Sequence, residues 1–236
     1  MSNELFCYKY PHPAIATDNV VFGYDGKSLY VLLIERGLDP YKGSWALPGG
    51  FIHIDETVEE GARRELCEET NVKDIYIEQF HVFSAVDRDP RERVLSVAFL
   101  ALVRKSDYCV IAGDDAMKAE WFNINNLPSL AFDHADIIAM ARERLQQLLR
   151  YKPIAFKLLD DKFIISELQK LYEIINDTEY DRRNFQKKML ATGLLKTEGI
   201  CSIPMQCRAP QMFSFDEAKY NELLENKYNR KYPFDF

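Results

Sequence analysis

Three glutamates in the first third of the chain have the spacing of a cation-binding site. Glu65, Glu68 and Glu69 stand at positions i, i+3 and i+4 of a segment predicted to be helical, so one helix turn directs three carboxylates toward nearly the same side. Like charges placed so closely repel one another. A hard divalent cation removes that cost, because Mg²⁺ accepts carboxylate oxygens, keeps several waters and bridges substrate phosphates. The spacing therefore favours metal-assisted phosphate chemistry, and the competing interpretation is a solvated acidic helix face.

Residues beside these glutamates supply accessory groups for such a site. Arg64 can hold one carboxylate in place, and Glu56 can pair with Arg64 across the start of the helix. The pair Gly49-Gly50 permits a close approach of the backbone and could offer a carbonyl to the metal.

The segment from residue 47 to residue 72 resembles the Nudix box. That motif is a glycine, five residues, a glutamate, seven residues and then Arg-Glu-U-x-Glu-Glu-x-Gly-U, where U is apolar. This full spacing decides against the solvated acidic face. Asn71 replaces the last glycine, and asparagine is the next-best residue for the left-handed backbone that ends a helix, so the departure is mild. The positions that match are Gly50, Glu56, Arg64, Glu65, Leu66, Glu68, Glu69 and Val72.

The resemblance implies an activity and a set of residue roles. Nudix hydrolases cleave a nucleoside diphosphate linked to another moiety, using Mg²⁺ (or Mn²⁺) held by the glutamates of the box and an attacking water. Carried over to this chain, Glu68 is a metal ligand or the base, and Glu56 and Arg64 join it as candidate catalytic residues. The implied metal ligands are Gly50, through its carbonyl, Glu65, Glu68 and Glu69.

Candidate substrate-contacting groups also lie outside the box. Glu120, in a short predicted strand, is a candidate base, and the alternative is an ordinary carboxylate at a strand end. Asp87, Arg88 and Arg91 belong to a predicted loop, where they could contact a substrate or simply be solvated. Arg36 follows a predicted strand and could meet a phosphate or be exposed.

The elements that must position these residues are mostly strands. Strands are predicted at 19–23 and 28–35 around the turn signal Asp25-Gly26, and also at 75–86 and 93–104. Helices are predicted at about 57–70 and at about 135–149, the second from apolar residues at helical spacing. Mixed strands with two helices on separate stretches predict an α+β fold, an α/β/α sandwich, which we assign to residues 1–150.

A second domain is predicted over residues 151–236, because the composition changes near Pro153. It is expected to contain three helices and then two short strands around a loop. Ser166 and Gln169 have the spacing of a capping box at the start of the second helix. The third helix is expected to begin at the N-cap Asp181 and to end before Gly193.

This third helix has one apolar and one basic face. Phe185 and Met189 lie at i and i+4 and would face a small core. The opposite face can neutralise phosphates and contact guanine or adenine edges in a major groove, and Arg208 would lie at a wing tip. The alternative is a basic, solvated helix in a dimerisation domain. The residues predicted on the basic face are Arg182, Arg183, Gln186 and Lys187.

Two further resemblances point to a regulator. Residues 86–99 resemble the Nudix proteins that bind ADP-ribose, many of which carry a C-terminal winged helix-turn-helix. They include the Nudix-related repressors of NAD biosynthesis and relatives that respond to sugars such as arabinose. Residues 151–236 resemble that winged domain, and residues 181–190 match its recognition helix. The implied partners are a nucleotide-sugar or sugar effector and a double-stranded DNA operator, bound by a homodimer.

Charge and composition limit the possible classes of protein. Residues 1–150 hold 16 Lys and Arg against 24 Asp and Glu, a net −8, whereas residues 182–208 hold six against one, a net +5. Nucleic acid is therefore expected on the second domain only. The chain has no apolar run of the ~18–20 residues that a membrane span needs, and its five scattered cysteines are typical of reduced thiols. A cytoplasmic protein without membrane partners is expected.

Two hypotheses remain open from the sequence. The first is a DNA-binding transcriptional regulator whose Nudix domain senses an ADP-ribose-like nucleotide-sugar or a sugar. The second is an Mg²⁺-dependent pyrophosphohydrolase acting on ADP-ribose or a related nucleoside diphosphate derivative, with the second domain serving assembly. Both hold if hydrolysis of the effector ends the signal.

Overall fold

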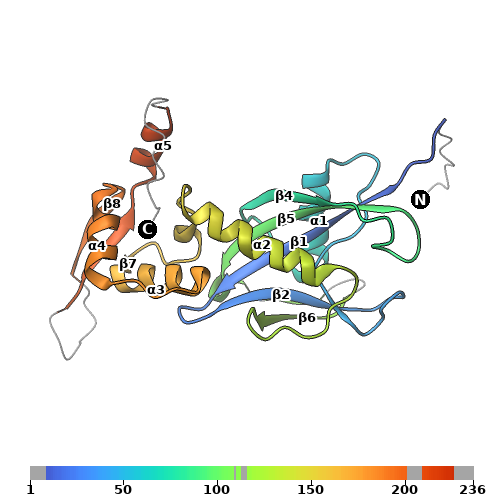
Figure 1. Ribbon diagram of the computed structural model, residues 1–236, viewed down its shortest axis with the longest axis horizontal. Helices are drawn as coiled ribbons and strands as arrows, with labels where there is room; N and C mark the ends of the chain where they lie inside the picture. The colour runs from blue at the N-terminus through green and yellow to red at the C-terminus, as the bar shows by residue number, and fades with distance from the viewer. Residues whose placement is uncertain (1–8, 109, 113–115, 201–208, 226–236) are drawn as a thin grey trace.

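The structure, a computed structural model, describes residues 9–108, 110–112, 116–200 and 209–225 (Figure 1). In these residues, a six-stranded mixed sheet between two helices leads into a smaller unit of helices with a three-stranded sheet. The predicted α+β class, a sandwich followed by a winged helix unit, is confirmed.

The large sheet has the order β3-β2-β1-β5-β4. The sixth strand, β6, lies outside this order and also pairs with β2. The central strands β1 and β5 run parallel, and the other pairs are antiparallel. The predicted hairpin joins β1 to β2, and the Asp25 carboxylate accepts the amide hydrogens of Lys27 and Ser28 in its turn. The strands span Ala14–Tyr24 (β1), Leu29–Arg36 (β2), Trp45–Ala46 (β3), Ile77–Phe83 (β4), Val94–Arg104 (β5) and Ala116–Asn123 (β6).

One helix covers each face of this sheet (Figure 1). Helix α1, Val58–Thr70, packs its buried Leu66 against one face, and helix α2, His134–Leu149, packs Ile137 and Ala141 against the other. Strands β1 and β5 are consequently buried on both sides, which explains their nearly continuous apolar sequences. The short 3-10 turn η1, Lys105–Asp107, follows β5.

The winged helix unit differs from its predicted elements in detail. The first of the three expected helices is only the 3-10 turn η2, Ile154–Lys157. Helix α3 begins before Ser166, so the predicted Ser166–Gln169 capping box is wrong. Glu167 instead accepts the amide hydrogen of Ile164 at 2.9 Å. Strand β7 and helix α5 were not expected. The remaining elements are β7 (Phe163–Ile164), α3 (Ile165–Asn176), α4 (Arg182–Ala191), β8 (Leu195–Ile200), β9 (Gln211–Phe215) and α5 (Glu217–Glu225).

A single apolar core runs from the large sheet through α2 into the winged helix unit. Leu148 and Leu149 at the end of α2 are almost fully buried, as are Leu171 and Tyr172 of α3, and all four belong to the same cluster as Phe22 of β1. The two parts of the chain are therefore packed together through α2 rather than joined only by a linker.

Candidate functional site

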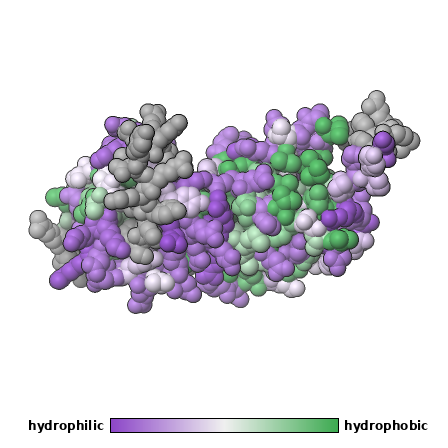
Figure 2. Space-filling view, turned by 45° about the horizontal axis from the view of Figure 1, so that its top comes forward, coloured by the Kyte–Doolittle hydropathy of each residue, from purple (hydrophilic) through white to green (hydrophobic). Residues whose placement is uncertain are grey.

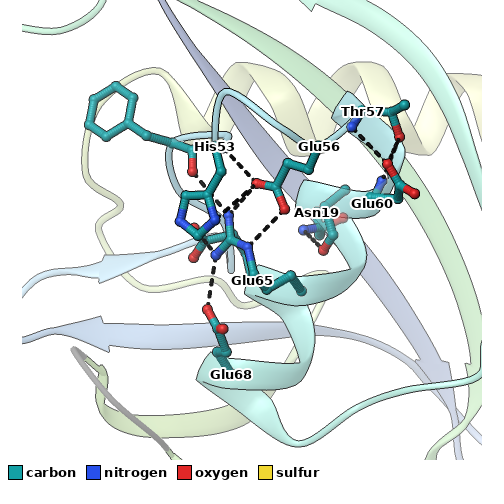
Figure 3. Close-up of polar contacts among 10 residues, drawn as sticks. Asn19, His53, Glu56, Thr57, Glu60, Glu65 and Glu68 are labelled. Carbon is teal, nitrogen blue, oxygen red and sulfur yellow. Dashed lines mark hydrogen bonds and ion pairs between the residues drawn. The ribbon is translucent and has the colours of Figure 1, made fainter. Parts of the chain in front are cut away.

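Both ends of helix α1 are fixed by local hydrogen bonds, which sets the direction of its glutamates. At the start, Thr57 and Glu60 form a capping box, with the Glu60 carboxylate accepting the Thr57 amide hydrogen at 2.8 Å and the Thr57 hydroxyl accepting that of Glu60 at 3.2 Å (Figure 3). At the end, Asn71 adopts the left-handed conformation with φ +58°. The asparagine thus serves where the box normally has glycine.

Arg64 gathers three of the carboxylates that the sequence singles out. Its guanidinium donates to Glu56 at 2.6 and 3.0 Å, to Glu65 at 2.8 Å and to Glu68 at 2.9 Å. Figure 3 labels these three glutamates. Hydrogen bonding to Arg64 lowers the pKa of Glu56 to about 2. The predicted pairing of Arg64 with Glu56 is present. In the described residues, the contacts of Arg64 and Glu56 join the segment 51–56 to helix α1.

Glu69 has a different environment from the other glutamates. It is buried, with 8% of its surface exposed, and its carboxylate accepts the amide hydrogen of Gly49 at 2.8 Å. Burial raises the pKa of Glu69 to about 8, and the Glu65 charge adds to this rise. Helical spacing predicts the common side of Glu65, Glu68 and Glu69, but it does not predict that Glu69 lies beneath the loop 47–50.

Two glycines allow that loop to lie on the glutamates. Gly49 has φ +154°, and a Cβ there would lie 2.0 Å from the carbonyl oxygen of Thr17. A Cβ at Gly50 would lie 2.6 Å from the Glu65 carboxylate. The Gly50 carbonyl, a predicted metal ligand, accepts the Thr17 amide hydrogen at 2.9 Å, which leaves one lone pair of that oxygen for another partner.

A cavity of about 370 Å³ lies beside this loop, a size usual for small-molecule sites. Its walls come from β1, β2, the loop 37–39, the loop 47–53, α1, the loop 88–91, the start of β5 and the start of α2. The predicted residues Glu68, Glu120 and Asp87 are not part of its walls, and Glu120 lies exposed on β6. The wall residues used below are Asp18, Arg36, Gly49, Gly50, Phe51, Glu65, Glu69, Arg88, Asp89, Arg91, Phe132 and His134.

Arg88 is buried in the cavity wall rather than solvated. Its side chain is 5% exposed, and its guanidinium donates to Asp133 at 2.7 and 2.9 Å and to Asp18 at 3.1 Å. A buried guanidinium held by two carboxylates ties the loop 87–91 to β1 and to the start of α2. These contacts fix the position of the Arg88 side chain at the cavity wall.

Arg91 and Arg36 present positive charge to the cavity beside two aromatic rings. Arg91 pairs with the buried Asp89 at 2.7 Å and lies 5.2 Å from the centre of the Phe51 ring. Arg36 lies 4.9 Å from the centre of the Phe132 ring and donates to the carbonyl of Pro40 at 2.9 Å. Burial and the nearby Arg91 charge lower the pKa of Arg36. Two guanidinium groups next to aromatic faces suit a ligand that has both phosphates and a ring.

Sequence reasoning missed the buried polar residues under the cavity. His134 accepts the Leu47 amide hydrogen on Nδ1 at 2.8 Å, so the proton of the neutral ring is on Nε2, which faces the Asp18 carboxylate at 3.3 Å. Asp18 also accepts the Ser96 hydroxyl hydrogen. Burial lowers the pKa of His134. The sequence did offer one signal of these buried polar groups, because Asp18 and Ser96 interrupt otherwise apolar strands.

The carboxylates suit a divalent cation that shares its coordination with a ligand. In the described ranges, no cluster of three or more His, Cys, Asp or Glu side chains is arranged to hold a metal ion. Glu65 and Glu69 nevertheless line one cavity, whereas Glu68 is 42% exposed and turned toward Arg64. One or two carboxylates completed by waters and substrate phosphates is the usual environment of Mg²⁺, and the residues present fit that arrangement.

The helix predicted to bind DNA forms as expected. Asp181 accepts the Asn184 amide hydrogen at 2.9 Å and caps α4. Phe185 and Met189 are buried. The four predicted contact residues, Arg182, Arg183, Gln186 and Lys187, are all exposed, whereas Arg208 lies outside the described residues.

The sandwich, the box geometry and the exposed basic helix together define a Nudix domain followed by a winged helix domain. Residues 12–141 match the model of the NUDIX domain, and residues 155–215 match that of the NrtR DNA-binding winged helix domain. The chain belongs to the Nudix family.

Relatives of known structure or activity are similar to one or both parts. The chain is 31% identical over 216 residues, 90% of this chain and 86% of the relative, to the ADPR responsive transcriptional repressor NtrR of Acinetobacter baylyi. It is 46% identical over 129 residues, 55% of this chain and 73% of the relative, to an ADP-ribose pyrophosphatase of Methanocaldococcus jannaschii.

Solved structures of Shewanella oneidensis NrtR resemble most of the chain or its Nudix part. The protein alone gives a TM-score of 0.73 at 30% identity, covering 86% of this chain and 94% of that one. The structure complexed with a 27mer DNA gives 0.71 at 30% identity, covering 85% and 93%. The NUDIX domain of that protein complexed with ADP ribose gives 0.54 at 36% identity, covering 58% and 90%.

Proposed function

We propose that this protein is an ADP-ribose-responsive transcriptional repressor, with the ligand bound in the Nudix cavity and operator DNA bound by α4. The observation that carries the proposal is the presence of both sites in one chain packed around one core. A cavity with two guanidinium groups lies in the Nudix domain, and an exposed basic helix lies in the winged helix domain. Relatives named for each of these two ligands resemble the chain over most of its length.

The cavity offers a partner to each chemical part of a nucleotide-sugar. Arg36 and Arg91 are placed to neutralise a diphosphate through charge-assisted hydrogen bonds. Phe51 and Phe132 line the same cavity with guanidinium groups over their rings, and an adenine is proposed to pack against these aromatic side chains. Arg88 holds the loop 87–91, which carries Arg91, in place through its ion pairs with Asp18 and Asp133.

Mg²⁺ (or Mn²⁺) is the proposed cation, held by Glu65 and Glu69 with the Gly50 carbonyl. When bound, it supplies positive charge against the ligand phosphates. Glu69, buried and short of positive charge, gains most from a cation at this position. Glu68, outside the cavity wall, is the proposed base of any hydrolysis rather than a ligand of this ion.

The proposed DNA contacts are the exposed polar residues of α4.

The proposed assembly is a homodimer. Strand β4 is an edge of the large sheet. Exposed apolar residues lie on this strand, after it and on the adjacent α2, namely Val82, Val86 and Met140. Figure 2 shows apolar surface gathered over part of the Nudix domain, whereas polar surface predominates at the other end apart from the grey residues. A second copy is the proposed partner of this edge, and it would provide two recognition helices for a palindromic site.

The cytoplasm is the proposed location, as the compartment in which the proposed repressor would meet its operator DNA. Among the described residues, none of the helices has the length and apolar character to cross a membrane.

The test is a panel of ligands scored by thermal stabilisation of the full chain, with and without Mg²⁺ or Mn²⁺. The panel contains ADP-ribose, related nucleotide-sugars and free pentoses. ADP-ribose at 100 times its Kd should stabilise the fold by about 2.7 kcal/mol, and binding to a duplex selected from a random pool should be visible by mobility shift. Absence of stabilisation by every nucleotide-sugar, or absence of any selected duplex, would contradict the proposal.

A second activity, hydrolysis of ADP-ribose, is favoured by the intact box glutamates and by the 46% identity to a pyrophosphatase. Chromatographic detection of AMP and a sugar phosphate after incubation with ADP-ribose and Mg²⁺ tests it. Glu69→Gln should abolish product formation if the wild-type protein forms it. Equal turnover by the variant would remove the metal-site assignment.

A further inference from the structure

The N-terminal end of α2 is hydrogen-bonded to residues of the cavity wall. His134 accepts the Leu47 amide hydrogen, and Leu47 immediately precedes the loop whose Gly49 amide contacts Glu69. One residue earlier, Asp133 holds the buried Arg88. A ligand that reorders the loop 47–50 or the loop 87–91 therefore acts on groups bonded to the first turn of this helix.

The other end of α2 is bonded directly to the winged helix unit. Gln146 donates through Nε2 to the carbonyl of Ile175 at 2.8 Å. Ile175 is the penultimate residue of α3, so its carbonyl is one of those that a helix end leaves without an intrahelical partner. The Tyr172 hydroxyl of α3 also donates to the Leu149 carbonyl at 3.4 Å.

Between these ends, α2 is one uninterrupted helix of 16 residues, about 24 Å long. Its apolar side is packed against the sheet and then against the winged helix unit in the same core. Arg144 donates to Glu78 on β4 at 2.9 Å, which attaches the helix to the edge strand of the sheet. A helix packed in this way shifts or rotates as a unit rather than bending within one turn.

We propose that α2 carries ligand binding from the Nudix cavity to the winged helix unit, with His134 as the positioning residue at the cavity end and Gln146 at the α3 end. This inference rests on the proposed function, because it requires both ligands. Helix α3 packs against α4, with the Tyr172 ring 5.5 Å from that of Phe185. A displaced α3 therefore displaces the recognition helix.

The test compares Gln146→Glu with Gln147→Glu in the full chain. Both substitutions add one negative charge to neighbouring positions of α2. Gln146→Glu is isosteric but removes the donor to Ile175, whereas Gln147 is exposed and lies on another side of the helix. The measured quantity is the ratio of Kd values for a selected duplex with and without saturating ADP-ribose. Gln146→Ala is the second variant, which removes the donor without adding charge.

The expected result is that Gln146→Glu and Gln146→Ala each move this ratio at least about threefold toward one, while the Kd for ADP-ribose alone stays within about twofold of wild type. Gln147→Glu should keep the wild-type ratio. A wild-type ratio in both Gln146 variants would overturn the route through α2 and leave the proposed function standing. A ratio of one in the wild type, or failure of the wild type to bind ADP-ribose or any selected duplex, would instead contradict the proposed function, and the inference with it.

Discussion

Glu69 lies beneath the Gly49–Gly50 loop as a carboxylate with little solvent and one amide donor. Burial raises the pKa of Glu69 to about 8. Glu56 lies beside Arg64 instead, and hydrogen bonding to that arginine lowers the pKa of Glu56 to about 2. The box spacing predicts the pairing of Arg64 with Glu56, because both belong to the motif. It does not predict the burial of Glu69, which depends on the distant Thr17 backbone that holds the loop in place.

The raised pKa of Glu69 leads to a pH dependence of stability. In the metal-free protein, the folded state keeps this proton up to about pH 8, whereas the unfolded chain loses it near pH 4.5. The unfolded state therefore binds fewer protons between these values, and the free energy of unfolding falls as the pH rises. Glu69→Gln, which retains an oxygen for the Gly49 amide, should be more stable than wild type by a few kcal/mol at pH 8.5 and similar to it below pH 4.5.

Urea unfolding in EDTA across this pH range measures the difference. Mg²⁺ with ADP-ribose should reduce or reverse it, because a cation stabilises the ionised carboxylate only in the wild type. A difference between variant and wild type that does not change with pH would contradict the buried carboxylate.

Arg88 and Arg91 are three residues apart, but their substitution should affect different properties. Replacing Arg88 should mainly lower stability, and replacing Arg91 should mainly weaken ligand binding. Arg88→Met leaves Asp18 and Asp133 without their buried partner, so the free energy of unfolding should fall by about 3–5 kcal/mol. Arg91 is 41% exposed, so Arg91→Met should cost about 1 kcal/mol and weaken ADP-ribose binding about tenfold or more.

Chemical unfolding and calorimetric titration separate the two roles. A stable Arg88→Met protein with weakened ADP-ribose binding would return Arg88 to the ligand. The sequence could not distinguish these arginines, because both lie within two residues of an aspartate in one loop. Only the fold brings Asp18 and Asp133 to Arg88.

At the level of elements, helix caps were predictable where the capping residue is local. Asp181 is followed by its apolar stripe at the expected spacing, and it caps α4. Ser166 and Gln169 have an equally good local pattern, but α3 begins earlier because Phe163 and Ile165 are drawn into the core. Tertiary packing therefore overrode the local signal. Strand β7 has two residues, and without its partner β9 such a short segment carries no strand pattern.

The continuous core predicts where the Nudix part can be separated. A fragment of residues 1–150 exposes Leu145, Leu148 and Leu149, which are buried against later residues. A fragment of residues 1–160 retains η2 with Ile154 and Leu158, and its Tm should be higher by about 5 °C or more. Calorimetry of both fragments tests this expectation, and equal Tm values would show that the second part contributes nothing to the sandwich.

Neither fragment should bind duplex DNA, since residues 1–150 carry a net −8 and lack α4. Binding by either one would place a DNA site in the Nudix domain and overturn the division of labour.

At the scale of the whole molecule, α4 should account for much of the salt dependence of DNA binding. Arg183→Ala with Lys187→Ala removes two exposed cations, so the slope of log K against log salt should flatten by about 1.8 per protomer. The control, Lys42→Ala with Lys73→Ala, removes the same charge from exposed positions of the Nudix domain and should leave the slope unchanged. Equal flattening in both double variants would mean that only net charge matters.

The most direct test of the account is reciprocity between the two proposed ligands of the full chain. Fluorescence anisotropy of a selected duplex gives the factor by which saturating ADP-ribose changes the affinity for DNA, and calorimetry gives the factor by which saturating DNA changes the affinity for ADP-ribose. Thermodynamic linkage requires these two factors to be equal, and couplings of this kind are typically about 5–150-fold. The account predicts one common factor in that range. Two factors of one, with both ligands bound, would contradict a protein that senses ADP-ribose in order to regulate its hold on DNA.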